Sequence, residues 1–394
     1  MTTEGTAVAA DYDPLDEQTL RDPYPLYQGF RQDKPIARAD AFGGFWVITR
    51  YADVKAAAAD TETYSSATGG ITIPPFGNPV PFIPIEVDPP EHAGYRKPLQ
   101  GWMSKGRMVA LEHELRRIVD GVLAPLLARG HGDLAVELAE PVPSIVLARV
   151  LGLPEADWSR FMRLGHTIVD AGERSDLETA GAAVFELMAY LNEQIEQRRA
   201  TPGEDMLSQI VHMRVGGRPM SDQEVLGAAF FLVEAGHETT VGAIGTMLLH
   251  LARHPEQRRR LIEDPELIGG AIEEALRFDP PIQNLARTLT RDVTLHGVHM
   301  KAGDRVLLCW GSANRDEQTF ERADELIIDR KRNHHVTFGS GVHHCLGAPL
   351  ARLEMRVVLE KVLEHMPEYR VENEDEVVVG GLIARRVKRM PVVW

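Results

Sequence analysis

The chain is poor in cysteine and carries less positive than negative charge. Only two of its 394 residues are cysteine, at positions 309 and 345, so no disulfide framework is indicated and the cytoplasm is the expected location. Its 43 basic residues are outnumbered by 58 acidic residues, giving a formal net charge of -15. That balance argues against nucleic acid or an anionic membrane as the partner.

The sequence also lacks an uninterrupted run that would cross a membrane. Its first 18 residues carry acids and no apolar core, unlike a secretory signal or an amino-terminal anchor. Residues 225–251 are mostly apolar, but Glu234, His237 and Glu238 interrupt the middle and make a membrane span costly. We therefore expect no membrane partner, and we expect residues 1–15 to be poorly ordered.

Length and composition fit one large enzyme domain. A chain of 394 residues with 44% hydrophobic content can bury a large core. The Pro-rich stretch at residues 74–84 is flanked by ordinary globular sequence, so it resembles a long functional loop and not a domain boundary. Residues 1–394 are therefore expected to form a single domain, and the protein is expected to be a monomer.

The local patterns predict many helices and a few short strands. Long amphipathic stretches occupy most of residues 104–275, while residues 37–50 place β-prone residues on both sides of Gly43 and Gly44. Paired glycines in that setting predict a hairpin with a primed turn. Cys309 lies among further short strands and is expected to be a packed core thiol.

Cys345 stands in a glycine-rich motif, FGSGVHHCLG, at residues 338–347. Gly339, Gly341 and Gly347 permit a tight turn around it, and the next segment has helical spacing. The sulfur would therefore lie just before a helix amino terminus, where backbone N–H groups and the helix dipole favour the thiolate that binds iron. The alternative is a small buried thiol in a turn, the usual role of a lone cysteine in a reduced protein.

The motif resembles the haem-binding motif of the cytochrome P450 family. The matching residues are Phe338, Gly339, Gly341, His343, Cys345 and Gly347. The resemblance implies haem b (iron protoporphyrin IX) as the cofactor and Cys345 as the thiolate ligand of its iron. It also implies a mainly α fold with a minor β region and a triangular outline, in which a long central helix crosses over the haem.

Residues 225–251 resemble that central helix, and Ser221 with Glu224 makes a capping box at its start. Small side chains leave room for dioxygen, and a threonine hydroxyl that bonds back to the preceding turn opens the helix locally. The family carries a small residue, a glycine, an acid and a threonine over the distal haem face, and these correspond to Ala235, Gly236, Glu238 and Thr239. The resemblance makes Glu238 and Thr239 the catalytic pair that relays protons. Many bacterial relatives carry aspartate at the position of Glu238.

A third match lies at Glu274 and Arg277, which are spaced to share one helix face. Such a pair by itself is usually a surface ion pair worth a few tenths of a kcal/mol. The resemblance joins it to Arg330 in a buried network behind the haem. We assign these residues to folding and haem retention.

Haem carries two propionates, whose negative charge requires cationic partners. His92 and Arg96 lie four residues apart and so share a helix face. Arg287 matches the arginine that the family places on the strand after the glutamate–arginine helix, and His343 completes the set. His344 has no matching role and is expected at the proximal surface.

The resemblance implies a monooxygenase that inserts one oxygen atom from O2 into a compact hydrophobic substrate by hydroxylation, epoxidation or O-dealkylation. A thiolate ligand favours cleavage of the O–O bond, whereas histidine favours oxygen binding or peroxidase work. A ferredoxin or flavodoxin, with its reductase, must supply electrons because the chain has no flavin domain or second cysteine cluster. That donor is expected at a basic patch on the cysteine side, formed by Arg96, Lys97, Lys105, Arg107, Arg352 and Arg356.

The same resemblance points to four segments around the substrate: the Pro-rich loop, residues 231–235, residues 281–285 and residues 380–384. Gln283 and Asn284 are the polar anchors expected there. Three alternatives stay open: a peroxide-using haem-thiolate enzyme, a non-catalytic docking module, and a haem-based gas sensor. The first typically lacks the acid–alcohol pair that Glu238 and Thr239 provide.

Overall fold

The computed structural model describes residues 11–74, 79–174 and 176–394. Residues 1–10, where poor order was expected, lie outside the described residues, as do residues 75–78 of the Pro-rich loop. Residues 11–15 are described, and here the chain is held in place. Tyr12 is buried, and the backbone N–H groups of Asp11 and Tyr12 both donate to the carbonyl of Arg38.

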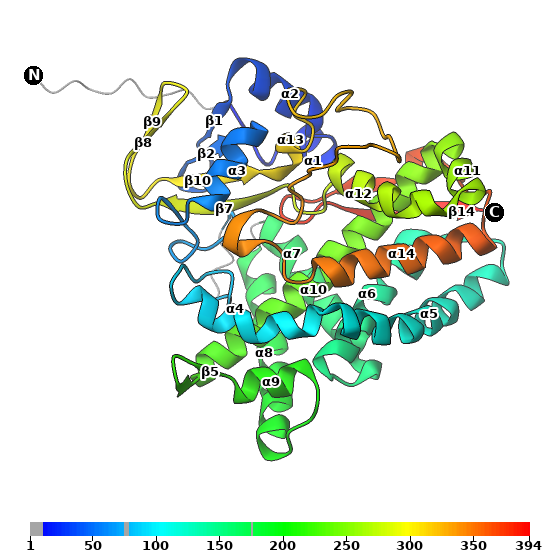
Figure 1. The fold of residues 1–394 in the computed structure, drawn as a ribbon, viewed down its shortest axis with the longest axis horizontal. Helices are drawn as coiled ribbons and strands as arrows, with labels where there is room; N and C mark the ends of the chain where they lie inside the picture. Colours follow the sequence, from blue (N-terminus) through cyan, green and yellow to red (C-terminus); the bar gives the residue numbers. More distant parts are fainter. Residues whose placement is uncertain (1–10, 75–78, 175) are drawn as a thin grey trace, which may run out of the picture.

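The described residues form a large helical region and a smaller sheet region, with a roughly triangular outline (Figure 1). The helices are α1 Glu17–Arg21, α2 Tyr24–Asp33, α3 Tyr51–Ala59, α4 His92–Gln100, α5 Lys105–Leu127, α6 Pro141–Leu151, α7 Trp158–Glu173, α8 Leu177–Ala200, α9 Met206–His212, α10 Asp222–Arg253, α11 Pro255–Glu263, α12 Ile268–Phe278, α13 Trp310–Ala313 and α14 Ala348–His365. The prediction of long helices over most of residues 104–275 is confirmed.

The strands are short and gather mainly in one five-stranded sheet, whose order is β1-β2-β10-β7-β3. The strands are β1 Ile36–Ala39, β2 Phe45–Ile48, β3 Tyr64–Ser65, β4 His131–Asp133, β5 Arg214–Val215, β6 Arg218–Pro219, β7 Asn284–Leu289, β8 Val293–Leu295, β9 Val298–Met300, β10 Arg305–Cys309, β11 Arg370–Val371, β12 Val378–Gly380, β13 Arg386–Arg389 and β14 Pro391–Val393. Strand β10 runs parallel to β2, and the other pairs of this sheet are antiparallel.

The hairpin predicted around Gly43 and Gly44 is present, but its turn is longer than predicted. Strands β1 and β2 pair antiparallel up to Ala39 opposite Phe45, which leaves residues 40–44 as the connection. Three successive residues of it, Phe42, Gly43 and Gly44, have positive φ angles of 52°, 86° and 87°. A two-residue primed turn has no room for this many residues, because the ladder already closes at Ala39.

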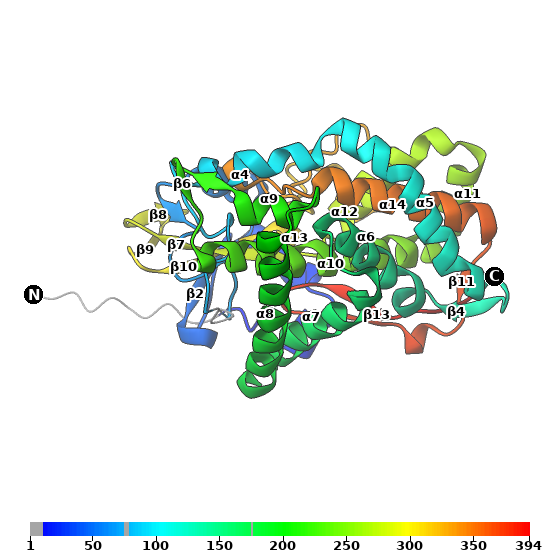
Figure 2. The same ribbon diagram turned by 90° about the horizontal axis from the view of Figure 1, so that it is seen from below.

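Helix α10 is the central element, as the sequence predicts. It begins with the predicted capping box, in which Ser221 accepts from the backbone of Glu224 and the Glu224 carboxylate accepts from the backbone of Ser221. Helices α6, α7, α8, α12 and α14 and strand β13 all pack on it (Figures 1 and 2). Among the described residues, no helix has the length and apolar character needed to cross a bilayer.

The described part of the Pro-rich loop packs on the first half of α10. The ring of Phe82 lies 5.8 Å from that of Phe230 and 5.4 Å from that of Phe231. Gly227 lets the carbonyl of Pro81 approach the helix, since a side chain at that position would collide with it. The loop therefore covers the half of α10 that precedes its polar centre.

Cys309 is a packed core thiol, as predicted. It is buried at the end of β10, in an apolar cluster with Tyr12 and Tyr27. Burial raises the pKa of its thiol to about 11, so the group stays protonated at neutral pH.

Candidate active site

The Cys345 loop is a tight turn that leads directly into α14. The backbone N–H of Cys345 donates to the carbonyl of Phe338 at 2.7 Å, which closes the loop. Gly339 and Gly341 both have a φ of 72°, a conformation that favours glycine. Gly347 has an ordinary φ of -79° and is the N-cap of α14, so its glycine is not required by the turn. A side-chain carbon there would lie 4.0 Å from the sulfur.

The surroundings of Cys345 have two opposing effects on the pKa of its thiol. Desolvation raises the pKa of the thiol, whereas the backbone N–H groups of Gly347 and Ala348 and the charges of Arg96 and Arg352 lower it. The amino terminus of α14 therefore does face the sulfur, as the motif predicts. The net pKa is raised, so the thiolate requires a bound cation to be the stable form.

Beside the loop lies an ion-paired group of three side chains, two of which no sequence pattern indicates. Arg352 stacks on the ring of Phe338 at 4.4 Å and donates to Glu273 at 2.6 Å. His335 lies 3.1 Å from the same carboxylate. Glu273 and His335 are 62 residues apart, and only the folded chain brings them together.

The predicted propionate partners converge from three elements. His92 and Arg96 lie on α4, Arg287 lies on β7, and His343 precedes Cys345. The rings of His92 and His343 have centroids 4.5 Å apart, and His92 Nε2 and His343 Nδ1 are buried without a hydrogen-bond partner. Arg287 is 3% exposed, yet its only described hydrogen bond is to the neighbouring Ala286 carbonyl.

This group is electrostatically incomplete. Burial and the charges of Arg287, His92 and Arg96 lower the pKa of His343 to about 3, and burial lowers the pKa of Arg287 to about 10. The buried guanidinium of Arg287 has no ion-pair partner among the described residues, and the two unpartnered imidazoles beside it become cationic only when an anion is present. The residues present therefore fit the two carboxylates of a haem. His344, as predicted, is exposed, and its carbonyl accepts from Arg96.

The predicted network of Glu274, Arg277 and Arg330 is present and fully buried at its centre. Arg277 makes two hydrogen bonds of 2.8 Å to Glu274, and Arg330 donates to the same carboxylate at 3.0 Å. The remaining donors of Arg277 reach the carbonyls of Asn314, Ala323 and Glu325. The pair is therefore a buried anchor of α12 and not a surface ion pair.

On α10, the predicted small residues lie on two different faces. Ala235 and Thr239 lie one turn apart, and the Thr239 hydroxyl donates to the Ala235 carbonyl at 3.0 Å. This is the back-bonded threonine that the sequence predicts. Gly236 points about 100° away from Ala235, and a side-chain carbon on it would lie 2.7 Å from Leu147 on α6. Its glycine is required for helix packing.

Glu238 is enclosed by partners that the sequence did not indicate. Arg386 on β13 forms an ion pair with it, and His166 Nε2 on α7 lies 2.9 Å from its Oε2. Arg386 also pairs with Asp170 at 3.2 Å. Burial lowers the pKa values of His166 and His237 to about 4, so both rings are neutral near pH 7. No local pattern links positions 166, 238 and 386.

One of the two expected polar anchors has a different role. Gln283 is buried and donates to the Tyr24 hydroxyl at 3.2 Å and to the Pro280 carbonyl at 2.7 Å, so its amide is used inside the fold. The Tyr24 hydroxyl in turn donates to Asp279 Oδ1 at 2.6 Å, so Gln283 belongs to a buried polar network. Asn284 is half-buried and makes no described side-chain hydrogen bond.

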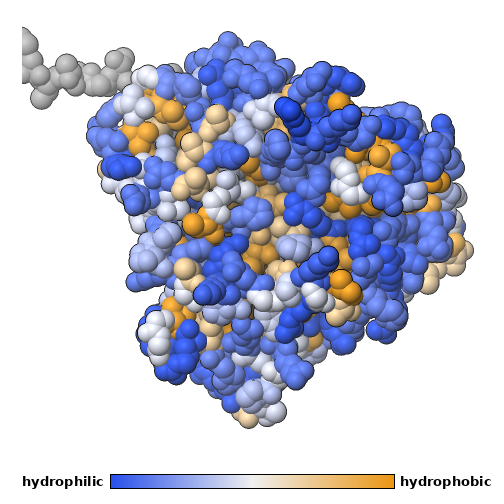
Figure 3. All heavy atoms as spheres, viewed as in Figure 1, coloured by the Kyte–Doolittle hydropathy of each residue, from blue (hydrophilic) through white to orange (hydrophobic). Residues whose placement is uncertain are grey.

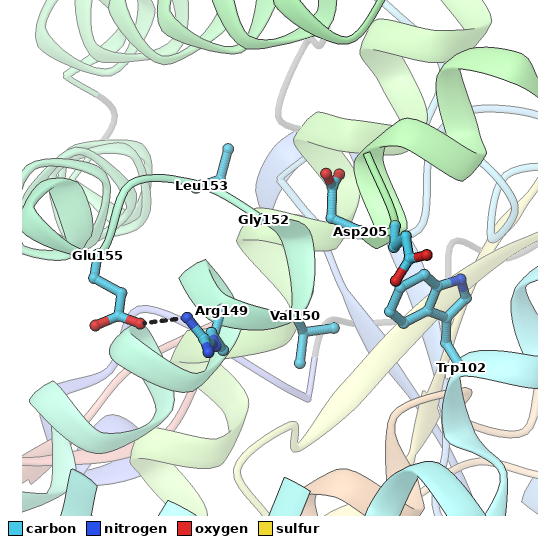
Figure 4. A pocket seen from close by; sticks show the side chains of 8 residues that line it. Trp102, Arg149, Val150, Gly152, Leu153, Glu155 and Asp205 are labelled. Carbon is cyan, nitrogen blue, oxygen red and sulfur yellow. Dashed lines mark hydrogen bonds and ion pairs between the residues drawn. The ribbon is translucent and has the colours of Figure 1, made fainter. Parts of the chain in front are cut away.

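A separate hollow of about 640 Å³ lies between α6 and α9 (Figure 4). Most of its polar lining is already paired. Arg149 binds Glu155 at 3.1 Å, and the ring of Trp102 is covered by Arg107 at 3.8 Å. We assign it no role in the active site.

The chain is similar to known proteins over nearly its whole length. The family model described as cytochrome P450 matches residues 168–377. Cytochrome P450 130 of Mycobacterium tuberculosis is 38% identical over 396 residues, covering 95% of this chain and 95% of that protein. The vitamin D(3) 25-hydroxylase of Pseudonocardia autotrophica is 36% identical over 403 residues, covering 100% and 98%. The mycinamicin IV hydroxylase/epoxidase of Micromonospora griseorubida is 35% identical, covering 93% and 94%.

Solved structures agree with the sequence relatives. The Bacillus subtilis bacillaene polyketide synthase cytochrome P450 PksS superposes with a TM-score of 0.88 at 30% identity, over 97% of this chain and 99% of that one. Myxobacterial cytochrome P450 CYP267B1, solved with myristic acid, gives 0.89 at 31% identity, over 96% and 98%. The predicted fold is thereby confirmed, and the chain belongs to the cytochrome P450 family of oxidoreductases, which bind haem b through a cysteine thiolate.

Proposed function

We propose that this cytochrome P450 monooxygenase inserts one oxygen atom from O2 into a compact hydrophobic organic substrate, by hydroxylation, epoxidation or O-dealkylation. The observation that carries the proposal is the buried, unpaired Arg287 beside the unpartnered rings of His92 and His343, next to the Cys345 loop. The names of the relatives refer to vitamin D(3), mycinamicin IV and steroids as well as fatty-acid complexes, which supports a hydrophobic substrate without selecting one.

In this proposal Cys345 is the metal ligand, and Phe338, Gly339 and Gly347 shape its loop. The haem propionates are bound by the cationic side chains that converge beside the loop, namely His92, Arg96, Arg287 and His343. When bound through a thiolate, haem supplies the activation of dioxygen. The chain itself supplies orientation, exclusion of water and protons.

We assign the delivery of protons to residues of α10. Thr239 holds its hydroxyl against the Ala235 carbonyl, one turn away on the half-buried face of the helix. Glu238 is the next residue, and His166, which is partly exposed, lies between its carboxylate and the surface. We assign Glu238 and Thr239 the transfer of protons to oxygen, with Ala235 and Gly236 providing the space and the helix packing that this requires.

A separate ferredoxin or flavodoxin, with its reductase, is proposed to dock on the cysteine side. A groove of about 470 Å³ lies there between α5, α12 and α14, with an apolar floor and a basic rim. Its floor includes Met103, Met108, Ile272 and Leu353, and its rim includes Lys105, Arg352 and Arg356. Helices α5 and α14 lie side by side on the face seen in Figure 1, and Figure 3 shows hydrophilic residues over most of that face.

The cations of the predicted basic patch differ in whether an acidic neighbour balances their charge. Arg352 pairs with Glu273, and Arg356 pairs with Glu112 and Glu360, so their charge is largely balanced. Lys97 and Lys105 have no ion-pair partner within the described part of the chain. Unpaired surface charges contribute most to steering an acidic partner.

Charge reversal of both lysines tests the docking proposal. We expect Lys97→Glu with Lys105→Glu to slow reduction by a ferredoxin about tenfold or more at low salt, because steering changes association rates by 10 to 10³. Ligand binding should be unchanged. Lys301→Glu, which follows strand β9 and does not line this groove, is the matched control and should be reduced at the normal rate. Equal reduction rates for the double variant and the wild type would remove the proposed docking site.

We further propose that residues 1–394 act as one domain, as a monomer and in the cytoplasm. The packing of α10 against α6, α7, α12 and α14 supports the first of these, because this one helix contributes to the two largest apolar clusters of the described residues. Size-exclusion chromatography with light scattering of the haem-loaded protein tests whether it is a monomer.

The first experiment is the reduced, carbon-monoxide difference spectrum of the purified protein beside Cys345→Ala. A strongly red-shifted Soret band in the wild type that is lost in the variant is the expected result. A haem band that survives the substitution would place the iron on another ligand and favour a haem-based sensor. A protein that binds no haem would favour the non-catalytic docking module.

A further inference from the structure

Two histidines and a glutamate converge where α7 packs against α10, and the fold leaves their facing atoms without hydrogen bonds. His166 Nε2 lies 2.9 Å from Glu238 Oε2, and His237 Nε2 lies 3.7 Å from the same oxygen. The three atoms all lie within 4.8 Å of one another, and no described hydrogen bond uses any of them. In the part of the chain that the structure describes, no other group of three histidine, cysteine, aspartate or glutamate side chains converges in this way.

The local structure turns one ring nitrogen of His237 toward this point. His237 Nδ1 lies 2.9 Å from the carbonyl of Val233, which only accepts, so Nδ1 carries the hydrogen and Nε2 has a free lone pair. Gly165 makes room for the ring, since a side-chain carbon at that position would lie 2.6 Å from His237 Cε1. A hydrogen bond from the far ring nitrogen to a carbonyl is the usual support of a metal-bound histidine.

Burial leaves these atoms with few other partners. The side chains of His237 and Glu238 are 0% and 4% exposed, so bulk water does not solvate them. A lone pair of His237 and an oxygen of Glu238 are both acceptors, and two buried acceptors that face each other cannot satisfy each other. A metal cation between them satisfies both.

Arg386 does not fill this point. It pairs with the other oxygen of Glu238, Oε1, and with Asp170 at 3.2 Å. Lys388 also pairs with Asp170, at 2.9 Å, and Glu140 lies close enough to Arg386 for their charges to interact. The two cationic side chains are therefore matched by acidic ones, and Glu238 Oε2 is left for a ligand.

From this arrangement we propose that His166, His237 and Glu238 bind a zinc ion, and that the bound ion inhibits the enzyme by occupying Glu238. Two imidazoles and one carboxylate are a ligand set that zinc takes in proteins, with water in the fourth position. Bonds of about 2.0 to 2.2 Å place the ligand atoms of a tetrahedral zinc about 3.3 Å apart. The two distances of 2.9 and 3.7 Å bracket that separation.

Inhibition follows from the chemistry of the carboxylate. A carboxylate that binds a metal is held in its deprotonated form, so Glu238 cannot pass on a proton while zinc is bound. This consequence rests on the proposed role of Glu238 in proton delivery, whereas zinc binding depends only on the three ligands. The side chain of His166 is 16% exposed, so the ion can enter from its side.

The binding test titrates zinc chloride into the untagged, haem-loaded protein by isothermal titration calorimetry. We expect one ion to bind at this site. Loss of a ligand in His166→Gln or Glu238→Gln should weaken binding at least about 100-fold, because loss of an outer-shell partner already costs about 10- to 100-fold. His299→Gln, which changes an exposed histidine paired with Asp292, is the matched control and should bind zinc as the wild type does.

The inhibition test measures turnover with a surrogate ferredoxin and its reductase, using the hydrophobic compound that binds most tightly. Zinc should lower product formation by the wild type about 10²-fold, the usual size of a general-acid contribution, and should release the oxygen consumed as hydrogen peroxide. In His166→Gln the same zinc concentration should leave the variant's own zinc-free turnover unchanged, which shows that the reductase is not the target.

The proposal is wrong if the wild type binds no zinc, or if His166→Gln and Glu238→Gln bind it as tightly as the wild type. Zinc that binds at these ligands without lowering turnover also contradicts it. The carbon-monoxide band is recorded for every variant. A normal thiolate band without zinc binding removes only this inference, whereas loss of that band in the wild type removes the proposed function.

Discussion

Glu274 on α12 and Glu234 on α10 are both carboxylates placed among apolar helices, but their surroundings are opposite. Glu274 accepts hydrogen bonds from Arg277, Arg330 and Asn333 and from the backbone of Ile327. Glu234 accepts none from any described residue. Glu238 is intermediate, since Arg386 and His166 approach its carboxylate without a described hydrogen bond to it.

The comparison distinguishes a carboxylate that holds the fold from one that its own chain leaves without hydrogen bonds. A carboxylate whose acceptors are all satisfied by its own chain has no capacity left for a ligand, and its neighbours are fixed by it. A buried carboxylate without donors is costly to ionise, so the group keeps its proton to higher pH. The network around Glu274 therefore holds the fold, while Glu234 on α10 is left unpaired by the described residues.

The largest expected effect comes from breaking the saturated network. Glu274→Gln leaves Arg277 and Arg330 as buried charges without a counter-ion, and removing one partner of a buried pair typically costs about 3 to 5 kcal/mol. We expect most of the variant to be recovered without haem and to melt well below the wild type. Thermal unfolding and the haem-to-protein ratio measure this, with Glu186→Gln as the exposed control. A variant that loads haem and melts normally would show that the network is dispensable.

The contrast also explains what the sequence alone predicted. The Cys345 loop, the capping box and the Glu274–Arg277 pair were predictable because each depends on residues close in sequence, whose spacing fixes which face they share. The family resemblance added the more distant members, such as Arg287 and Arg330. The fold followed from that resemblance and not from helical periodicity, because periodicity does not determine how helices pack.

The parts that were missed depend on contacts between distant segments. Glu238 was identified, but its partners His166 and Arg386 lie 72 residues before it and 148 residues after it, on elements whose packing no local pattern reveals. Gln283 was expected in the substrate site because it is polar, whereas the structure uses it to support Tyr24. In the sequence, Glu234 stands out only as a charge within an apolar segment. That it lacks a hydrogen-bond donor can be seen only in the folded structure.

The next effect concerns proton delivery and should leave the fold intact. Because Arg386 keeps Asp170 as a partner, Glu238→Gln is expected to melt close to the wild type, unlike Glu274→Gln. Thr239→Ala should behave likewise. In both variants oxygen consumed with a surrogate ferredoxin and its reductase should be released as hydrogen peroxide, and product formation should fall about 10²-fold, the usual size of a general-acid contribution.

The measurement is the ratio of peroxide released to O2 consumed in the presence of the hydrophobic compound that binds the protein most tightly. Thr240→Ala, one position along the helix and buried, is the matched control and should keep a low ratio. If Glu238→Gln leaves this ratio unchanged but greatly lowers stability, Glu238 has a structural role like that of Glu274 and does not deliver protons. Unchanged turnover with peroxide as the only oxidant in Thr239→Ala would favour the peroxide-using alternative.

The effect that is smallest at acidic pH is a gain of stability in Glu234→Gln, which grows as the pH rises. Burial raises the pKa of Glu234 from its ordinary value of 4.5 to about 8, so the folded protein keeps a proton that the unfolded chain has already lost between these values. Folding stability contributed by this group therefore falls as pH rises through that window. His166, His237, Glu238 and Arg386 are the charged or titratable groups nearby, and all remain in the variant. The melting temperature of Glu234→Gln should match the wild type near pH 5 and exceed it increasingly up to about pH 8. A difference that stays flat with pH would mean that Glu234 has a partner in solution, and the distal carboxylate would then resemble Glu274 after all.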